Sequence, residues 1–170
     1  LLPAFRPHAA RRQKLAGRTT VRLGPDHRHG HAPCPELSPQ HRPSQLRLSW
    51  ALALADRYDE ARSLLAAIAA ASGVDATWQE YSALAAGAAG DHAAANQHWH
   101  ALQTIAAIQP VSAWTLARAA AAAGQHEAAL PQIEAAAVAR SSSVPFLAVS
   151  PAFDSLHDDA RFHALAARLG

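Results

Sequence analysis

The chain has 170 residues, enough for one domain with a modest core, and half of them are hydrophobic although aromatic residues make up only 6%. Alanine dominates the hydrophobic half, which favours helices over strands and small side chains at close helix contacts. The net charge of +2 hides an asymmetry, because residues 1–48 hold nine Lys or Arg against two Asp or Glu, whereas residues 49–170 hold six against eleven. We therefore expect a basic tail joined to a folded domain.

We expect neither a membrane-spanning helix nor a framework of disulfide bonds. No apolar run approaches the length of about 18 residues that a membrane-spanning helix needs, and no signal peptide is recognisable. Cys34 is the single cysteine, and the chain contains no methionine. We expect a fragment of a larger protein, located in the cytoplasm, with no cofactor.

Residues 1–42 form the predicted tail. Seven of the eleven prolines occur up to Pro43, and no period of 2 or 3.6 residues is sustained. This pattern predicts a mostly disordered segment or linker. A second interpretation is that the stretch is translated out of frame, since its Arg, Pro, His and Ala bias fits a GC-rich gene.

The tail also contains the sharpest chemical motif of the chain, DHRHGHAPC. Imidazole and thiolate groups suit zinc, nickel or copper, but their alternation on a proline-flanked strip predicts only weak, adventitious metal binding. Its arginines could contact phosphates, yet Phe5 alone is available for base stacking, so a nucleic-acid partner is not our first expectation. The candidate metal ligands are His27, His29, His31 and Cys34.

From residue 43 onward a short phrase recurs at an interval of 34 residues. The three copies are ADRYDEA, AGDHAAA and AGQHEAA, which end at Ala61, Ala95 and Ala129. Helix-compatible, alanine-rich stretches flank each copy. The spacing predicts three helical hairpins, at about 43–75, 76–109 and 110–144.

The turns of these hairpins carry residues that tolerate a left-handed backbone. Gly90 and Gly124 are expected to end the first helices of their hairpins, and Asp56 takes the same place in the first hairpin. We expect Pro131 in the first turn of the last hairpin's second helix, where a missing N–H matters little.

At these positions the chain resembles the tetratricopeptide repeat family, over about residues 43–140. The resemblance implies an α-solenoid of stacked hairpins that binds proteins rather than catalysing reactions. The turn aromatic of the family is present as Tyr58, with histidine in the other two copies. The remaining matches are small residues in the first helices (Ser49, Ala83, Ala117), alanines in the second (Ala61, Ala95, Ala129) and large residues one turn later (Leu65, Trp99, Ile133).

The family's concave groove indicates where a protein or peptide partner would bind. Trp and Arg side chains carry much of the binding energy at interfaces, so Trp50, Trp114 and Arg118 are the leading candidates. The alternative is that both tryptophans pack between repeats. Lys and Asn residues that clamp a terminal carboxylate in related cochaperones are absent. The full set of predicted groove positions is Leu46, Trp50, Glu80, Leu84, Trp114 and Arg118.

Residues 145–170 break the repeat and predict a helical cap. They resemble the ending of bacterial tetratricopeptide proteins in which the repeats follow a winged-helix domain, a protein kinase or a nucleotide cyclase. That resemblance implies a regulatory or sensory region as an alternative function. No P-loop, dinucleotide fingerprint or nucleophile elbow is recognisable, so we expect no catalytic residues. The apolar residues expected to close the repeats are Phe153, Leu156, Phe162 and Leu165.

Overall fold

The computed structural model describes residues 41–169, and the regular structure in these residues is helical throughout. The chain divides into two units, Leu1–Glu36 and Leu37–Gly170, and all described residues lie in the second unit. The all-α class expected from the sequence is confirmed for this part of the chain. The predictions for residues 1–40, including the metal-ligand candidates His27, His29, His31 and Cys34, lie outside the described residues.

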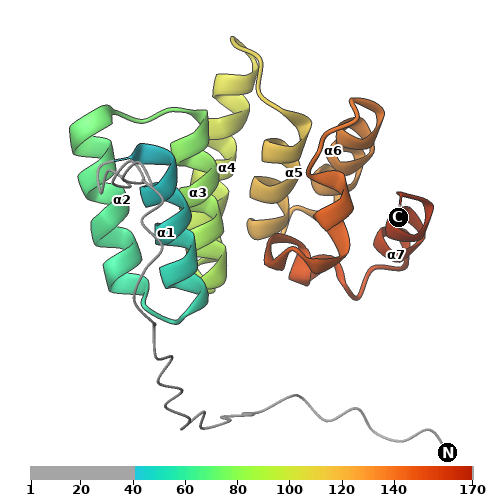
Figure 1. The fold of residues 1–170 in the computed structure, drawn as a ribbon, viewed down its shortest axis with the longest axis horizontal. Helices are drawn as coiled ribbons and strands as arrows, with labels where there is room; N and C mark the ends of the chain where they lie inside the picture. The colour runs from blue at the N-terminus through green and yellow to red at the C-terminus, as the bar shows by residue number, and fades with distance from the viewer. Residues whose placement is uncertain (1–40, 170) are drawn as a thin grey trace, which may run out of the picture. The chain divides into compact units, whose positions relative to one another are not determined.

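Three helical hairpins follow one another in chain order, each packed on the next (Figure 1). The second helices begin at intervals of 34 residues, as the recurring phrase predicts. The hairpins consist of α1 (Arg42–Leu54) with α2 (Tyr58–Ser72), α3 (Ala76–Ala88) with α4 (His92–Ala106), and α5 (Ala113–Ala122) with α6 (His126–Val138).

The three hairpin turns share one local structure. Asp56, Gly90 and Gly124 have φ angles of 61°, 73° and 72°, so the left-handed conformation expected at each turn is confirmed. In each turn the next N–H donates back to a carbonyl of the preceding helix, which satisfies a helix end and sets the angle of the second helix. These bonds run from Arg57 to Leu52 (2.9 Å), from Asp91 to Ala86 (2.9 Å) and from Gln125 to Ala120 (2.8 Å).

Side-chain caps define where three of the helices begin. A carboxylate or hydroxyl before the first turn accepts a backbone N–H that has no partner inside the helix. Asp75 accepts from Trp78 at 2.8 Å before α3, and Asp91 accepts from Ala94 at 3.0 Å before α4. Ser112 opens α5 in the same way.

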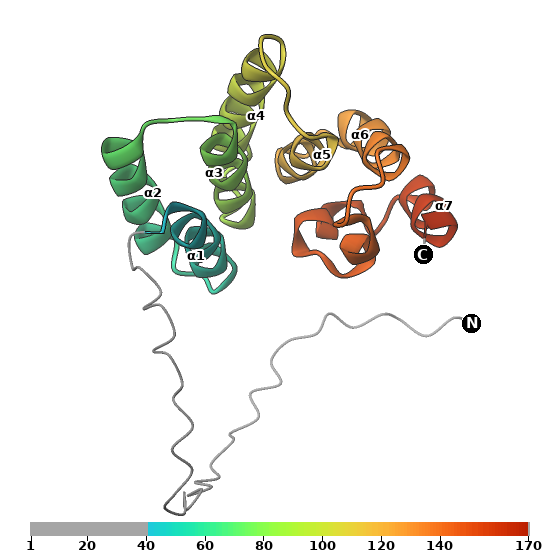
Figure 2. The same ribbon diagram turned by 45° about the horizontal axis from the view of Figure 1, so that its top comes forward.

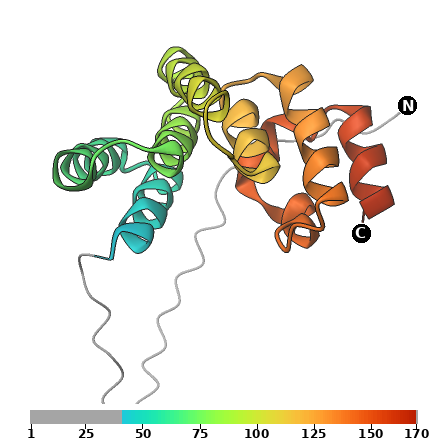
Figure 3. The same cartoon turned by 90° about the horizontal axis from the view of Figure 1, so that it is seen from above.

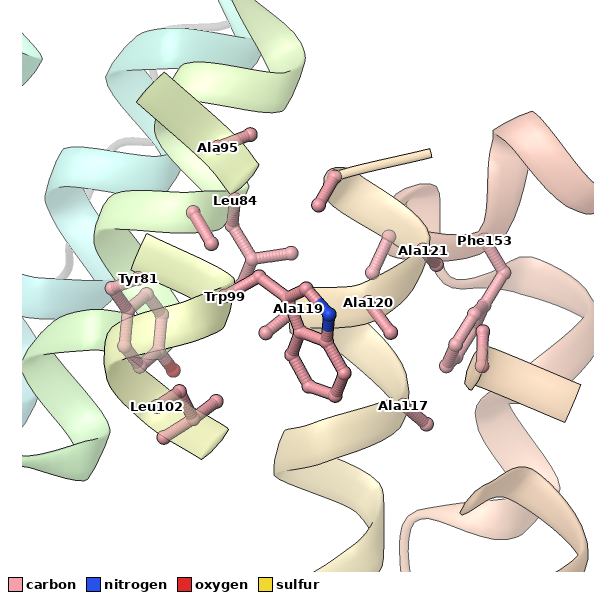
Figure 4. Close-up of a cluster of buried hydrophobic side chains, with 14 of the residues drawn as sticks. Tyr81, Leu84, Ala95, Trp99, Leu102, Ala117, Ala119, Ala120, Ala121 and Phe153 are labelled. Atoms are coloured by element: carbon pink, nitrogen blue, oxygen red, sulfur yellow. The ribbon is translucent and has the colours of Figure 1, made fainter. Parts of the chain in front are cut away.

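The core follows the 34-residue interval. A single hairpin cannot bury its apolar face alone, so neighbouring hairpins share one core. Figure 4 shows Trp99, Leu84 and the buried alanines of α5 within this cluster. Every position matched to the repeat pattern for small, alanine or large residues is buried: Ser49, Ala61, Leu65, Ala83, Ala95, Trp99, Ala117, Ala129 and Ile133.

α3 and α5 approach each other closely at Gly87. A Cβ atom on Gly87 would lie 2.5 Å from the carbonyl oxygen of Ala122, which is far inside van der Waals contact. Gly87 was not among the residues predicted from the sequence. Its small size permits two first helices to touch through their backbones.

Pro131 corrects one expectation about α6. This helix begins at His126, so Pro131 lies in its second turn rather than its first. At that position an ordinary residue would donate its N–H to the carbonyl of Glu127, and proline cannot.

We expect Pro131→Ala to raise the free energy of unfolding by about 2 kcal/mol, because the missing helix bond is restored and only part of the gain is offset by a freer unfolded chain. Urea unfolding followed by circular dichroism measures the change. Pro151→Ala is the matched control, because Pro151 is the first residue of its helix and removes no such bond. A Pro131→Ala protein no more stable than the parent would contradict this account.

The C-terminal segment closes the third hairpin. It comprises the 3₁₀ helices η1 (Val144–Val149) and η2 (Pro151–Leu156) followed by α7 (Ala160–Leu169). η2 packs on α5, and α7 lies beside α6 (Figure 2 and Figure 3). The four apolar residues expected to close the repeats are all buried: Phe153, Leu156, Phe162 and Leu165.

Candidate partner-binding groove

The first helices of the three hairpins lie in one row. α1 contacts α3, α3 contacts α5, and α5 contacts η2. The residues predicted to bind a partner occupy two positions, one helical turn apart, on these helices. Because both positions recur every 34 residues, the row brings them together: Leu46, Glu80 and Trp114 at one position, and Trp50, Leu84 and Arg118 at the other.

Arg118 is the centre of this set. One guanidinium nitrogen, Nη1, donates to Oε1 of Glu80 at 2.5 Å. The guanidinium carbon lies 4.8 Å from the centroid of the Trp50 ring and 5.4 Å from that of Tyr81, within the range of cation–π attraction. The hydroxyl of Thr115 donates to the other Glu80 oxygen at 3.1 Å. The cluster therefore joins side chains from α1, α3 and α5.

The ion pair between Glu80 and Arg118 is buried. Their side chains are 6% and 11% exposed. Burial raises the pKa of the Glu80 carboxyl, while Arg118 and the hydroxyl of Thr115 act against that rise. Removing one partner of such a pair would leave an uncompensated charge in the core. The pair consequently holds α3 against α5 rather than presenting charge to a partner.

Three of the six predicted groove positions are thus placed differently from expectation. Leu46 is 1% exposed, Glu80 is 4% exposed and Leu84 is 2% exposed, so these side chains offer little accessible surface to a partner. For Glu80 and Leu84 the physical reason is that α3 is the middle helix of the row, flanked by α1 and α5. All three side chains are buried in the packing of the hairpins.

The two tryptophans are half-buried and differ in their surroundings. Trp114 meets the ring of Phe153 edge-on, with centroids 5.2 Å apart and an interplanar angle of 71°. Trp114 is therefore part of the contact between α5 and η2, in line with the alternative that it packs structurally. Trp50 stacks on Arg118 and also lines an open cavity.

This groove cavity, with a volume of about 370 Å³, opens across the row of first helices. Its walls come from α1, α3, α5 and η2, together with the turns of the hairpins. Trp50 and Leu84 line it, whereas the other four predicted groove positions, Leu46, Glu80, Trp114 and Arg118, do not. The lining residues that were not predicted from the sequence include Gly87, Ala121, Ala152 and Ser155.

The charge of the groove cavity is acidic. Asp56 and Asp154 line it together with His92 and His126, and among its lining residues there is no Lys or Arg. Neither carboxylate forms an ion pair with any residue in 41–169. Asp56 accepts a hydrogen bond from the hydroxyl of Tyr58 at 2.7 Å. Asp56 was recognisable from the sequence as a turn residue. The presence of Asp154 in the same cavity depends on how α3 and α5 place α1 and η2.

The histidines that flank Trp99 have separate environments. Nδ1 of His98 lies 2.8 Å from Oε1 of Gln79, and Nδ1 of His100 lies 3.1 Å from Oε1 of Gln103. Burial lowers the pKa of the His98 imidazole. No group of three or more His, Cys, Asp or Glu residues that could hold a metal ion occurs within 41–169.

No protein-family model matches the chain, and neither a curated protein nor a solved structure matches it. None of the helices that the structure describes is long and apolar enough to cross a membrane. The class of molecule is thus defined by its architecture, a stack of three helical hairpins with a helical C-terminal segment.

Proposed function

We propose that this chain is a non-enzymatic interaction module, similar to tetratricopeptide repeats, that binds an extended segment of a partner protein in the groove cavity. The observation that carries the proposal is a cavity of about 370 Å³ that spans the first helices of all three hairpins. Volumes in this range accommodate a few side chains of a peptide. The half-buried Trp50 on the wall supplies an aromatic surface of the kind that concentrates binding energy.

The charges of the groove cavity favour a segment with basic side chains. Asp56 and Asp154 carry negative charge without a cationic partner among the described residues. Residues 49–170 as a whole hold six Lys or Arg against eleven Asp or Glu, so the surrounding field has the same sign. Complementary charge steers association and excludes acidic partners.

A capped peptide of alternating alanine and arginine tests the proposal with the full chain. We expect the double substitution of Asp56→Asn with Asp154→Asn to weaken its binding about tenfold, because two charge contacts of modest strength are lost. Asn tolerates the left-handed backbone at residue 56, so the turn is retained. Isothermal titration calorimetry at low and moderate salt measures the loss and its screening.

The control removes the same net charge elsewhere. Asp59→Asn with Asp158→Asn changes two exposed carboxylates that do not line the cavity. Equal weakening by both double variants would show that net charge, not the groove, attracts the peptide. Equal binding of the corresponding alanine–glutamate peptide would also refute the proposal. Trp114→Ala is unsuitable as a test because it removes a packing contact with Phe153.

A further inference from the structure

A second cavity lies on the other side of the first hairpin, between α2, α3 and α4. Its volume is about 320 Å³. Tyr58 is the one lining residue that it shares with the groove cavity. We call it the α2–α4 pocket, and its volume is at the lower end of the range for small-molecule sites. A site here would therefore be a different site from the groove cavity, with Tyr58 as their shared wall.

The walls of the α2–α4 pocket combine small apolar and aromatic side chains. Alanines from all three helices leave space that larger residues would fill. The indole of Trp78 is held in place because its Nε1 donates to the carbonyl of Leu65 at 2.9 Å. The ring of His98 meets this indole edge-on, with centroids 5.3 Å apart. The pocket thus has a fixed aromatic wall against which a planar ring would pack.

A buried hydroxyl lines the same pocket and has no partner. Ser82 is 3% exposed, and its Oγ forms no hydrogen bond with the described residues. A buried polar group without a partner costs about 1–3 kcal/mol. Most buried polar side chains in native proteins have a hydrogen-bond partner, either a protein group or an ordered water. A ligand with a hydroxyl or carbonyl at its buried end would satisfy Ser82.

A cation without an ion pair lines the pocket from the opposite helix. Arg62 on α2 is exposed, and it forms no ion pair with the residues of 41–169. Guanidinium groups bind carboxylates through two parallel hydrogen bonds. The polar groups of the pocket that have no hydrogen-bond or ion-pair partner among the described residues are therefore a hydroxyl on α3 and a guanidinium on α2, with apolar surface alongside them.

We propose that the α2–α4 pocket binds a small aromatic carboxylate that bears a ring hydroxyl. The ring packs against Trp78 and the alanines, the ring hydroxyl pairs with Ser82, and the carboxylate pairs with Arg62 at the exposed edge. This ligand class matches the volume, the aromatic wall and both unpaired polar groups.

Three further ionisable groups line the pocket, and none of them is an alternative to Arg62 as the cation. The hydroxyl of Tyr58 donates to Oδ1 of Asp56 at 2.7 Å and lies 3.2 Å from the carbonyl oxygen of Ala88. Burial lowers the pKa of the His98 imidazole, which disfavours its cationic form. Asp91 is an acid whose Oδ1 accepts the N–H of Ala94 at the start of α4, where the helix dipole compensates its charge. Asp91 would attract an amine, which makes the charge of the ligand a direct test.

The probe is 3-(4-hydroxyphenyl)propionate, titrated into the isotopically labelled full chain. We expect chemical-shift changes at the Trp78 indole N–H and at amides of α2, α3 and α4. Arg62→Gln should weaken binding about tenfold, as expected for loss of a charge-assisted contact. Arg47→Gln is the matched control, because it removes an exposed arginine of α1 that does not line the pocket and should leave the affinity unchanged.

Two further comparisons separate the ring hydroxyl from the carboxylate. Ser82→Ala should remove the preference for this probe over 3-phenylpropionate, and it should also raise the melting temperature of the free protein. Tyramine, which has the same ring and hydroxyl but an amine, should not bind. Tighter binding of tyramine would overturn the proposal in favour of Asp91. Shifts confined to the groove cavity, or equal effects of Arg62→Gln and Arg47→Gln, would also overturn it.

Discussion

Replacement of Arg118 by methionine should lower the free energy of unfolding by about 3–5 kcal/mol, the range expected when one partner of a buried ion pair is removed. The substitution leaves the Glu80 carboxylate in the core with only the Thr115 hydroxyl as a partner. It also removes the guanidinium from its place over the Trp50 and Tyr81 rings. Urea unfolding monitored by circular dichroism and by tryptophan fluorescence measures the loss.

Two controls distinguish a buried charge from lost packing. Glu80→Met combined with Arg118→Met should recover most of the stability, because an apolar pair of similar volume removes the uncompensated charge. The loss in Arg118→Met relative to the parent should also be smaller near about pH 5 than at about pH 7.5, since a Glu80 carboxyl with a raised pKa takes up a proton on folding as the pH falls. A double variant as unstable as the single one, with no pH dependence, would mean that packing alone is lost.

Gly87→Ala should lower the free energy of unfolding by about 1–3 kcal/mol, the cost of forcing an extra methyl group into a close-packed contact. The direction is the reverse of ordinary helix propensity, which favours alanine over glycine by about 1 kcal/mol. The cause is the Ala122 carbonyl oxygen, which lies 2.5 Å from the position of the new Cβ. α3 and α5 would have to separate, and the Glu80–Arg118 pair lies between the same two helices.

The matched control is an exposed helical position. Ala67 lies on α2 with its side chain in solvent, so Ala67→Gly should destabilise the protein by up to about 1 kcal/mol through propensity alone. Thermal unfolding of both variants tests the reversal of sign. If alanine stabilised residue 87 as it does residue 67, the close approach of the two backbones would be disproved.

The features that could be predicted from the sequence are those that recur. The 34-residue interval indicates the hairpins, and each left-handed turn residue has a local chemical reason, glycine or an aspartate that tolerates positive φ. Burial of Ala61, Ala95 and Ala129 follows from the same interval. These predictions could be made because the same pattern of residues occurs three times, so that each copy supports the interpretation of the other two.

The features that could not be predicted depend on contacts between helices. Glu80 and Arg118 were assigned to an accessible groove, and they pair in the core because α3 is covered on both sides. The acidic character of the groove cavity arises from Asp56 and Asp154, which are 98 positions apart in the chain. A cavity lined by alanines also cannot be predicted from the sequence, because it forms only where the small side chains of packed helices leave space between them.

The contact between Trp50 and Arg118 changes how the hairpins can unfold. In an ideal array each repeat interacts only with its immediate neighbours, and stability is a sum of repeat terms and nearest-neighbour terms. Here the side chain of Trp50 in the first hairpin contacts that of Arg118 in the third. The energetics therefore include a coupling between non-adjacent repeats, so that the middle hairpin cannot open without releasing a contact between its two neighbours.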